Sequence, residues 1–99
     1  MDEPTYSLER VKQLFKQNRW RVTLTAQTGA LDLGLDEEDI VDCILNHLNE
    51  THFYKTMQAR KVPGLMQDVY RVTYGACRIY LKLQIGKGEW AVVISFKEE

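Results

Sequence analysis

Two stretches of alternating apolar and polar residues decide the fold: CRIYLKLQI at residues 77–85 and EWAVVISFK at residues 89–97. Alternation with a period of two is typical of a strand that buries one face and leaves the other in water. The intervening Gly86-Lys87-Gly88 favours a hairpin. A two-residue loop at Lys87-Gly88 would align the apolar side chains as Ile85 with Trp90, Leu83 with Val92, and Ile79 with Phe96. This register predicts one continuous apolar face formed with Ile94 and Leu81.

The opposite face of this hairpin carries polar and basic side chains. The register sets Tyr80 opposite Ser95 and Arg78 opposite Lys97. A four-residue turn at 74–77 adds the strand 66–73 and places Arg71 opposite Tyr80. The predicted face carries no carboxylate and contains Gln67, Arg71, Arg78, Tyr80, Lys82 and Lys97.

Two interpretations of this face are open. Like charges directly opposite each other destabilise a sheet, so Arg78 against Lys97 indicates an anionic ligand. The alternative is an ordinary solvated face of an antiparallel sheet, which is commonly polar.

The second half of the chain is predicted to form a four-strand antiparallel meander. Strands at 53–61, 66–73, 77–85 and 89–97 are separated by Pro63-Gly64, Gly75 and the Gly-Lys-Gly turn. Alternation leaves the orientation of the first strand open. Either Lys55, Met57, Ala59 and Lys61 share the polar face, or Thr56, Gln58 and Arg60 do.

The first half has helical periodicity. One helix begins after Ser7 and ends near Asn18, and a second spans residues 25–33 and ends at Gly34. A third begins at Asp36 and is predicted to bury Ile40, Val41, Ile44, Leu45 and Leu48. Residues 20–24 suit an edge strand. We therefore expect a single α+β domain over residues 1–99, with N-terminal helices packed on one face of a mainly antiparallel, twisted sheet.

Composition and charge narrow the classes of function. The chain has no apolar run that could span a membrane, and the acidic start Met1-Asp2-Glu3-Pro4 is unlike a secretory signal. Cys43 and Cys77 are predicted to be reduced thiols of a cytoplasmic protein. Residues 1–51 hold five Lys/Arg and ten Asp/Glu, whereas residues 52–99 hold eight and four. The second half is thus the candidate for a polyanionic ligand, unless the two halves merely attract each other.

Other catalytic motifs are weak. We expect His47 and His52 to be structural or surface residues, and Glu37, Glu38, Asp39 and Asp42 to serve helix capping and solubility. Zinc-ligand spacing, a nucleophile elbow and a phosphate-binding glycine loop are missing from the sequence, so no metal site and no cofactor is predicted.

A Lys, Tyr and Arg cluster suits the cleavage of RNA. The 2′-hydroxyl is an internal nucleophile, so the protein must accept its proton, stabilise the phosphorane and protonate the leaving 5′-oxygen without needing a metal. Arginine binds phosphate oxygens bidentately, and crowded cations lower the pKa of a neighbouring lysine or tyrosine.

Four blocks of sequence resemble the MqsR family of bacterial toxins: FYKTM at 53–57, QDVYR at 67–71, IYLK at 79–82 and ISFKE at 94–98. LGLD at 33–36 extends the resemblance to nearly the whole chain. The resemblance implies a ribonuclease of the RelE-like class that cuts mRNA at short GC-containing sequences without the ribosome. It also implies a cognate MqsA-type antitoxin that contains zinc and binds DNA.

The resemblance also names the site. The family's active-site Lys, Gln and Tyr fall on Lys55, Gln67 and Tyr80, and the lysine of its C-terminal motif falls on Lys97. This places Lys55 on the polar face. The face argument adds Arg71, Arg78 and Lys82 as phosphate-binding residues. Segments 58–66 and 72–78 depart from the family form, so the cleavage-site preference does not carry over. Two rival functions use the same features: non-catalytic nucleic-acid binding by the basic face, and protein interaction through an edge strand.

Overall fold

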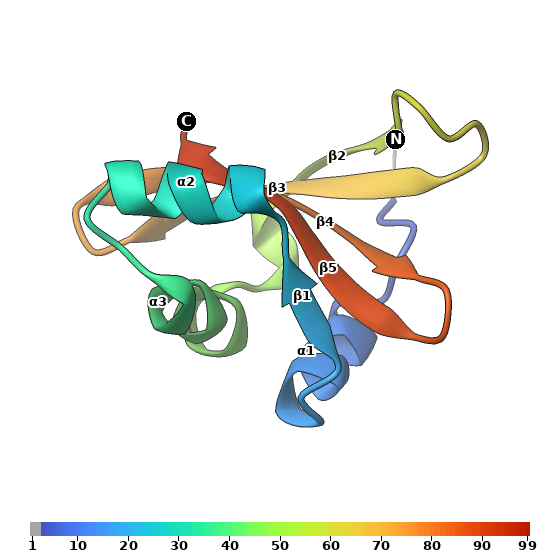
Figure 1. The fold of residues 1–99 in the computed structure, drawn as a ribbon, viewed down its shortest axis with the longest axis horizontal. Coiled ribbons are helices and arrows are strands. Elements are labelled where there is room, and N and C mark those ends of the chain that lie inside the picture. Colours follow the sequence, from blue (N-terminus) through green and yellow to red (C-terminus); the bar gives the residue numbers. More distant parts are fainter. Residues whose placement is uncertain (1–2) are drawn as a thin grey trace.

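The computed structural model describes residues 3–99, so part of the expectation about the N-terminus, at Met1 and Asp2, lies outside the described residues. Three α-helices precede the strands of the second half (Figure 1). They are α1 Leu8–Lys16, α2 Leu24–Asp32 and α3 Glu37–Asp42, the last continued by a π-helical turn η1 Cys43–His47 and a 3-10 turn η2 Glu50–His52. The strands are β1 Trp20–Val22, β2 Phe53–Gln58, β3 Met66–Tyr74, β4 Cys77–Gly86 and β5 Trp90–Glu98. None of the helices in the described part of the chain is long and apolar enough to cross a bilayer.

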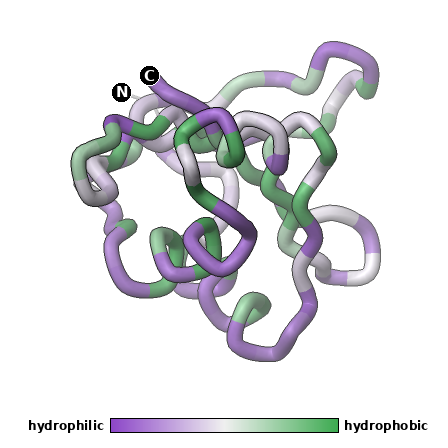
Figure 2. The backbone as a smooth tube through the Cα atoms, turned by 60° about the vertical axis from the view of Figure 1, so that its left-hand side comes forward, coloured by the Kyte–Doolittle hydropathy of each residue, from purple (hydrophilic) through white to green (hydrophobic). Residues whose placement is uncertain are grey.

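The five strands form one sheet in the order β1-β5-β4-β3-β2. Strands β2 to β5 are the expected antiparallel meander, and β1 pairs parallel to β5 at the edge. The α+β class with a mainly antiparallel sheet is therefore confirmed. The connection between β2 and β3 projects from the sheet and begins with hydrophilic residues (Figure 2).

The predicted helix signals are confirmed. The Ser7 side chain caps α1, and Asn18 takes a left-handed φ of 60° just beyond its end. Asp36 and Asp39 form a reciprocal capping box at α3. Gly34 has a φ of +76°, a backbone conformation that glycine adopts without a steric penalty, after α2.

The core lies between the sheet and the helices α1 and α3–η1. Helix α1 contributes Val11, Leu14 and Phe15 to this core, and α3–η1 contributes Ile40 and Ile44. All five side chains are nearly inaccessible to solvent. Val41 and Leu45 were predicted to be buried with them, but they are only half-buried. Together with Trp20 they line a surface hollow of about 530 Å³.

Helix α2 lies along the edge of β5 beyond the end of β1 (Figure 1). Thr23 donates from its hydroxyl to the carbonyl of Ile94 at 2.9 Å, and from its backbone to the carbonyl of Val93 at 3.1 Å. A Cβ atom at Gly29 would stand 2.2 Å from the carbonyl oxygen of Phe96. Glycine at this position thus allows the helix to cover the strand edge closely.

The register of the last hairpin differs from the prediction. The loop has three residues, so Gly86 pairs with Trp90, and Ile85 pairs with Ala91. A bulge at Ile94 then shifts the pairing again between Lys82–Ser95 and Leu83–Val93. As a result Ala91 and Val93 enter the core with Phe96, whereas Trp90, Val92 and Ile94 are only half-buried, against the expected pattern.

A buried carboxylate ties the N-terminal segment to the sheet. Asp68 is completely buried on β3, and its two carboxylate oxygens each accept a backbone N–H, one from Thr5 and one from Tyr6, both at 2.9 Å. The Tyr6 hydroxyl donates to the carbonyl of Met66 at 2.7 Å. These bonds fix the chain entering α1 against β3.

Candidate functional site

The sheet surface opposite α1 and α3 is here called the open face. Residues that pair directly across antiparallel strands share a face, so the register assigns its members. All seven predicted site residues belong to it: Lys55, Gln67, Arg71, Arg78, Tyr80, Lys82 and Lys97. The ambiguous strand is also resolved, because Lys55 pairs with Val69 and Met57 pairs with Gln67.

A row of Lys55, Val69, Lys82 and Ser95 crosses the centre of the open face. Val69 is fully buried although it lies on this face and not in the helix-side core. Its cross-strand neighbours on this face are Lys55 and Lys82, and both lysines are half-buried. Val69 thus forms an apolar floor between two cations.

Lys82 lies at the centre of this positive charge. Burial lowers its pKa below the ordinary lysine value, and the nearby charges of Lys97, Lys55 and Arg60 lower it further. The direction agrees with that predicted for a lysine among crowded cations, but burial, which the sequence argument did not include, is the larger cause. Arg60 comes from the β2–β3 connection, so this loop adds a cation to the face.

The next row contains Arg71, Tyr80 and Lys97. Tyr80 had been expected opposite Ser95; the three-residue loop and the bulge at Ile94 each shift the pairing by one residue and together place it opposite Lys97. The Lys97 ammonium lies 5.2 Å from the centroid of the Tyr80 ring. The correction gives Tyr80 a cationic neighbour on each side.

Tyr54 is a site residue that strand alternation misses. The register shifts between Phe53 and Lys55, and this bulge lets Tyr54 share the open face with Lys55. The guanidinium carbon of Arg71 lies 3.8 Å from the centroid of the Tyr54 ring, and the Lys55 ammonium lies 5.4 Å from it. Tyr54 was part of the quoted FYKTM block, which was the only available signal for it.

Gln67 is held within the sheet. Its side chain is nearly buried, and its amide nitrogen donates to the amide oxygen of Gln84 at 3.0 Å. The bond links β3 to β4 and fixes the orientation of the Gln67 amide beside the central row.

The prediction that the face lacks a carboxylate is wrong. Glu99 continues β5, and its carboxylate binds Arg71 at 3.0 Å and Arg78 at 3.1 Å. Arg78 therefore faces Glu99 instead of Lys97, so the expected like-charge pair does not exist. Neutralised and largely exposed, Arg78 marks the margin of the positive surface.

The remaining polar groups serve the fold on the other side of the sheet. Tyr74 donates to Asp42 at 2.7 Å and Asp39 at 3.1 Å, and these bonds raise the Tyr74 pKa. Hydrogen bonds from Asn46 and then from Tyr74 lower the Asp42 pKa. His47 packs edge-on against Tyr74, and His52 accepts a backbone N–H from Asn49. Both histidines have the structural roles predicted. Residues 3–99 contain no group of three or more His, Cys, Asp or Glu side chains arranged to hold a metal ion.

Neither cysteine takes part in a disulfide, as predicted. Cys43 is buried, and this burial raises the pKa of its thiol to about 12, so the reactive thiolate is disfavoured. Cys77 is half-buried at the margin of the core.

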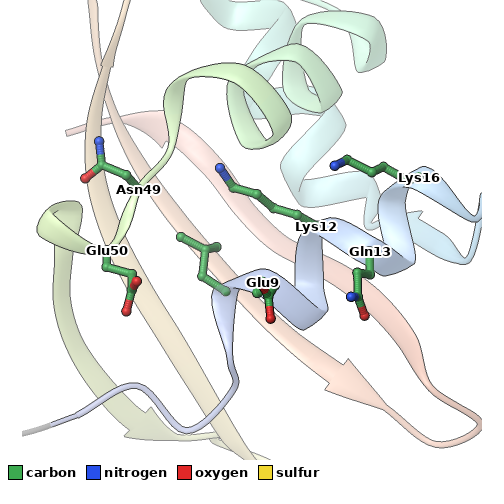
Figure 3. Close-up of a pocket in the computed structure, with 7 residues that line it drawn as sticks. Glu9, Lys12, Gln13, Lys16, Asn49 and Glu50 are labelled. Atoms are coloured by element: carbon green, nitrogen blue, oxygen red, sulfur yellow. The ribbon is translucent and has the colours of Figure 1, made fainter.

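The helix-bearing side also has a hollow of about 370 Å³ between α1 and the Asn49–Glu50 segment (Figure 3). Lys12 projects into this region but donates to the carbonyl of Leu48 at 2.6 Å. The cations and carboxylates around it are mixed, in contrast to the open face. We therefore assign the candidate site to the open face, where cations and phenols converge.

Comparison with known proteins identifies the family of the chain. The family described as "Motility quorum-sensing regulator, toxin of MqsA" matches residues 3–98. The mRNA interferase toxin MqsR of Escherichia coli (strain K12) is 33% identical over 96 residues, which are 97% of this chain and 95% of the relative. The resemblance inferred from the sequence blocks is confirmed over the whole fold. The chain belongs to the MqsR toxin family.

Proposed function

We propose that this protein is the toxin of a type II toxin-antitoxin system and acts as a metal-independent endoribonuclease on mRNA. The observation that carries the proposal is the convergence of Lys55, Tyr80 and Lys82 around the buried Val69, in a chain of the MqsR toxin family. The name of the E. coli relative, an mRNA interferase toxin, supports the same reaction class.

The reaction uses the 2′-hydroxyl of the substrate as nucleophile. The scissile phosphate lies over the central row, where the ammonium group of Lys82 faces its non-bridging oxygens. Lys55 and Tyr80 flank this position and exchange protons with the 2′-oxygen and the leaving 5′-oxygen. The geometry is compatible with either assignment of base and acid to these two residues.

The cations supply the electrostatic part of catalysis. Negative charge grows on the phosphorane, and fixed positive groups on a partly desolvated surface stabilise it more than water does. Lys82 and Lys97 bring this charge from β4 and β5. Arg71, which binds Glu99 in the free protein, exchanges that carboxylate for the neighbouring phosphate. The hydrogen bond to Gln84 holds the Gln67 amide ready to bind the substrate.

Tyr54 is placed to bind a base next to the cleavage site. It is 46% exposed, and its ring is held by Arg71 and Lys55. Single-stranded RNA is commonly bound by stacking an unpaired base on such an aromatic ring. The RNA substrate is therefore single-stranded at the site.

The partner of the toxin is an antitoxin of the MqsA type, in accord with the family description. Any zinc and the DNA-binding helix-turn-helix expected from the resemblance belong to that partner. A reading frame of this kind beside the gene, whose product co-purifies with the toxin and zinc, would support the assignment. The cytoplasmic location expected from the sequence stays a prediction.

The test removes one hydroxyl from the site. Purified protein should cut single-stranded RNA in EDTA, and primer extension should reveal new ends at defined sequences. Tyr80→Phe should slow cleavage by about 10²–10⁴-fold, the usual contribution of a proton-transfer group. A 2′-deoxy nucleotide at the mapped site should abolish cleavage there.

Tyr74→Phe is the matched control, because it removes a phenolic hydroxyl on the helix side of the sheet. It should cut RNA at the wild-type rate. Full activity of folded Tyr80→Phe would refute the role of Tyr80. Salt-sensitive RNA binding without new ends would instead indicate a non-catalytic binder.

A further inference from the structure

The open face contains a second cationic cluster, formed by Arg19, Arg21 and Trp90 at the β1 edge of the sheet. Arg21 pairs with Val92, which pairs with Gln84, so all three lie on the same face as Gln67 and the candidate site. Trp90 is adjacent along β5, and Arg19 lies just before β1. This cluster plays no part in the proposed cleavage chemistry.

Two guanidinium groups share one aromatic ring in this cluster. The guanidinium carbons of Arg19 and Arg21 lie 4.8 Å and 4.9 Å from the centroid of the Trp90 ring. The ring attracts each cation, but two like charges on one ring repel each other. A bound anion that contacts both groups relieves this repulsion.

The protein itself does not neutralise this pair. The nearest hairpin carboxylate, Glu89, is bound by Arg10 at 2.9 Å. Arg19 donates to the backbone carbonyls of Gly88 and Glu89, which orients its guanidinium without cancelling the charge. In the described part of the chain, the arginines found in ion pairs are Arg10, Arg71 and Arg78, so the exposed Arg21 keeps its full charge for a ligand.

The path from this cluster to the candidate site is free of carboxylates. Gln84, Val92 and Ser95 lie between the two positive regions on the open face. Trp90 is five residues from Ser95 along β5, which corresponds to about 17 Å at the usual rise of a strand. This distance corresponds to several nucleotides of a single strand, so one RNA can reach both regions.

We propose that Arg19 and Arg21, positioned by Trp90, form a distal subsite for the phosphodiester backbone of the RNA cleaved at the candidate site. The inference rests on the proposed function and deepens it. Arginine forks recognise phosphate oxygens bidentately, and two of them beside one ring direct this recognition to the RNA backbone. The subsite therefore binds backbone and adds affinity without adding sequence preference.

The test compares RNA lengths. A core RNA of a few nucleotides around a mapped cleavage site is compared with RNAs extended on the 5′ or the 3′ side. Non-cleavable 2′-O-methyl versions give the dissociation constants by fluorescence anisotropy. Wild-type protein should bind either the 5′-extended or the 3′-extended RNA more tightly than the core RNA. Charge-assisted contacts to phosphate should lower the dissociation constant on the order of tenfold.

Arg21→Gln should reduce this length advantage to about twofold or less and make the salt dependence of binding shallower, by about 0.7 in the logarithmic slope per lost phosphate contact. Arg21→Lys, which keeps the charge, should retain part of the advantage. Lys16→Gln removes one exposed positive charge on α1, away from the open face, and should preserve both the advantage and the slope.

Two results would overturn the subsite. One is an extended RNA that binds wild-type protein no more tightly than the core. The other is an Arg21→Gln variant that weakens core and extended RNA by the same factor. Failure of the wild-type protein to cut any RNA would refute the endoribonuclease instead. Single-stranded RNAs of graded length and the same repeated sequence would then replace the mapped set, and an Arg21-dependent length advantage among them would still support a backbone-binding subsite.

Discussion

Lys82 combines burial with a surrounding of like charges, and both effects disfavour its protonated form. Its pKa is lowered first by desolvation and then by Lys97, Lys55 and Arg60. A bound phosphate acts in the opposite direction, because an anion favours the charged ammonium. RNA binding and protonation of Lys82 are therefore coupled, and each strengthens the other.

The coupling predicts how RNA affinity depends on pH. A lowered pKa means that Lys82 loses its charge at a lower pH than an ordinary lysine, so affinity should fall as pH rises through that value. Lys82→Arg stays charged throughout and should retain affinity to a higher pH. Anisotropy with 2′-O-methyl RNA between neutral and alkaline pH would measure the difference between the two profiles.

The difference profile isolates position 82, because every other titrating group is common to both proteins. Superimposable profiles would show that Lys82 does not carry charge to the RNA. Weaker binding of Lys82→Arg at every pH would show instead that the arginine fork does not fit beside Val69.

At the scale of elements, α2 depends on one glycine. Alanine in the middle of an isolated helix is more favourable than glycine by about 1 kcal/mol. At Gly29 the added Cβ would stand 2.2 Å from the carbonyl oxygen of Phe96, which is backbone and cannot rotate away. Steric conflict at the interface between α2 and β5 outweighs the gain in propensity.

Gly29→Ala should therefore destabilise the protein by about 1–3 kcal/mol, the usual cost of overpacking. Urea unfolding followed by circular dichroism gives the change. Thr28→Ala on the exposed side of the same helix is the control and should change stability by less than about 0.5 kcal/mol. A Gly29→Ala variant as stable as wild type would show that α2 shifts away from β5 without cost.

The elements themselves could be predicted from the sequence, but two details of the strands could not. Helix caps at Ser7 and Asp36 and the glycine turns are local signals, and they placed the elements correctly. The length of the loop after Gly86 cannot be determined from the local sequence, because the glycine pattern fits a two-residue loop and a three-residue loop equally well. The predicted pairing of Tyr80 was wrong for that reason and because of the bulge at Ile94, which shifts the pairing by one further residue.

Two β-bulges account for the remaining errors in the predicted orientation of side chains. At Ile94 the apolar run Ala-Val-Val-Ile fits either face, so alternation could not show that Val93 and Phe96 both point inward. At Tyr54 the bulge brings two successive side chains to one face, which alternation excludes. The site residues were nevertheless placed on one face, because Gln67, Arg71, Tyr80 and Lys82 lie on strands joined by the correctly predicted turn at 74–77.

For the whole molecule, Asp68 joins the N-terminal segment to the middle of the sheet. The carboxylate is buried, and both its oxygens are occupied by backbone N–H groups from residues 62 and 63 positions earlier in the chain. Because these bonds hold the segment that leads into α1 against β3, their loss should weaken the attachment of this segment to the sheet.

Asp68→Asn should lower the free energy of unfolding by about 1–3 kcal/mol, since an amide nitrogen cannot accept the second N–H and leaves it unpaired. Chemical denaturation measures this loss, and faster proteolysis near Thr5 would locate it. Asp32→Asn makes the same chemical change at an exposed position and should have little effect. Equal stability of the two variants would mean that water replaces the lost acceptor.

The separation of charge between the two sides of the molecule acts before any contact with RNA is made. Cations gather on the open face, while Glu37, Glu38 and Asp39 begin α3 on the helix side. A polyanion that approaches by diffusion is attracted to the open face and repelled from the start of α3. The protein is therefore oriented with its open face toward the RNA before the two make contact. This orientation raises the association rate constant and weakens as the Debye length shrinks to about 8 Å at physiological salt. Ionic strength therefore sets how fast the toxin finds a transcript as well as how tightly it holds one.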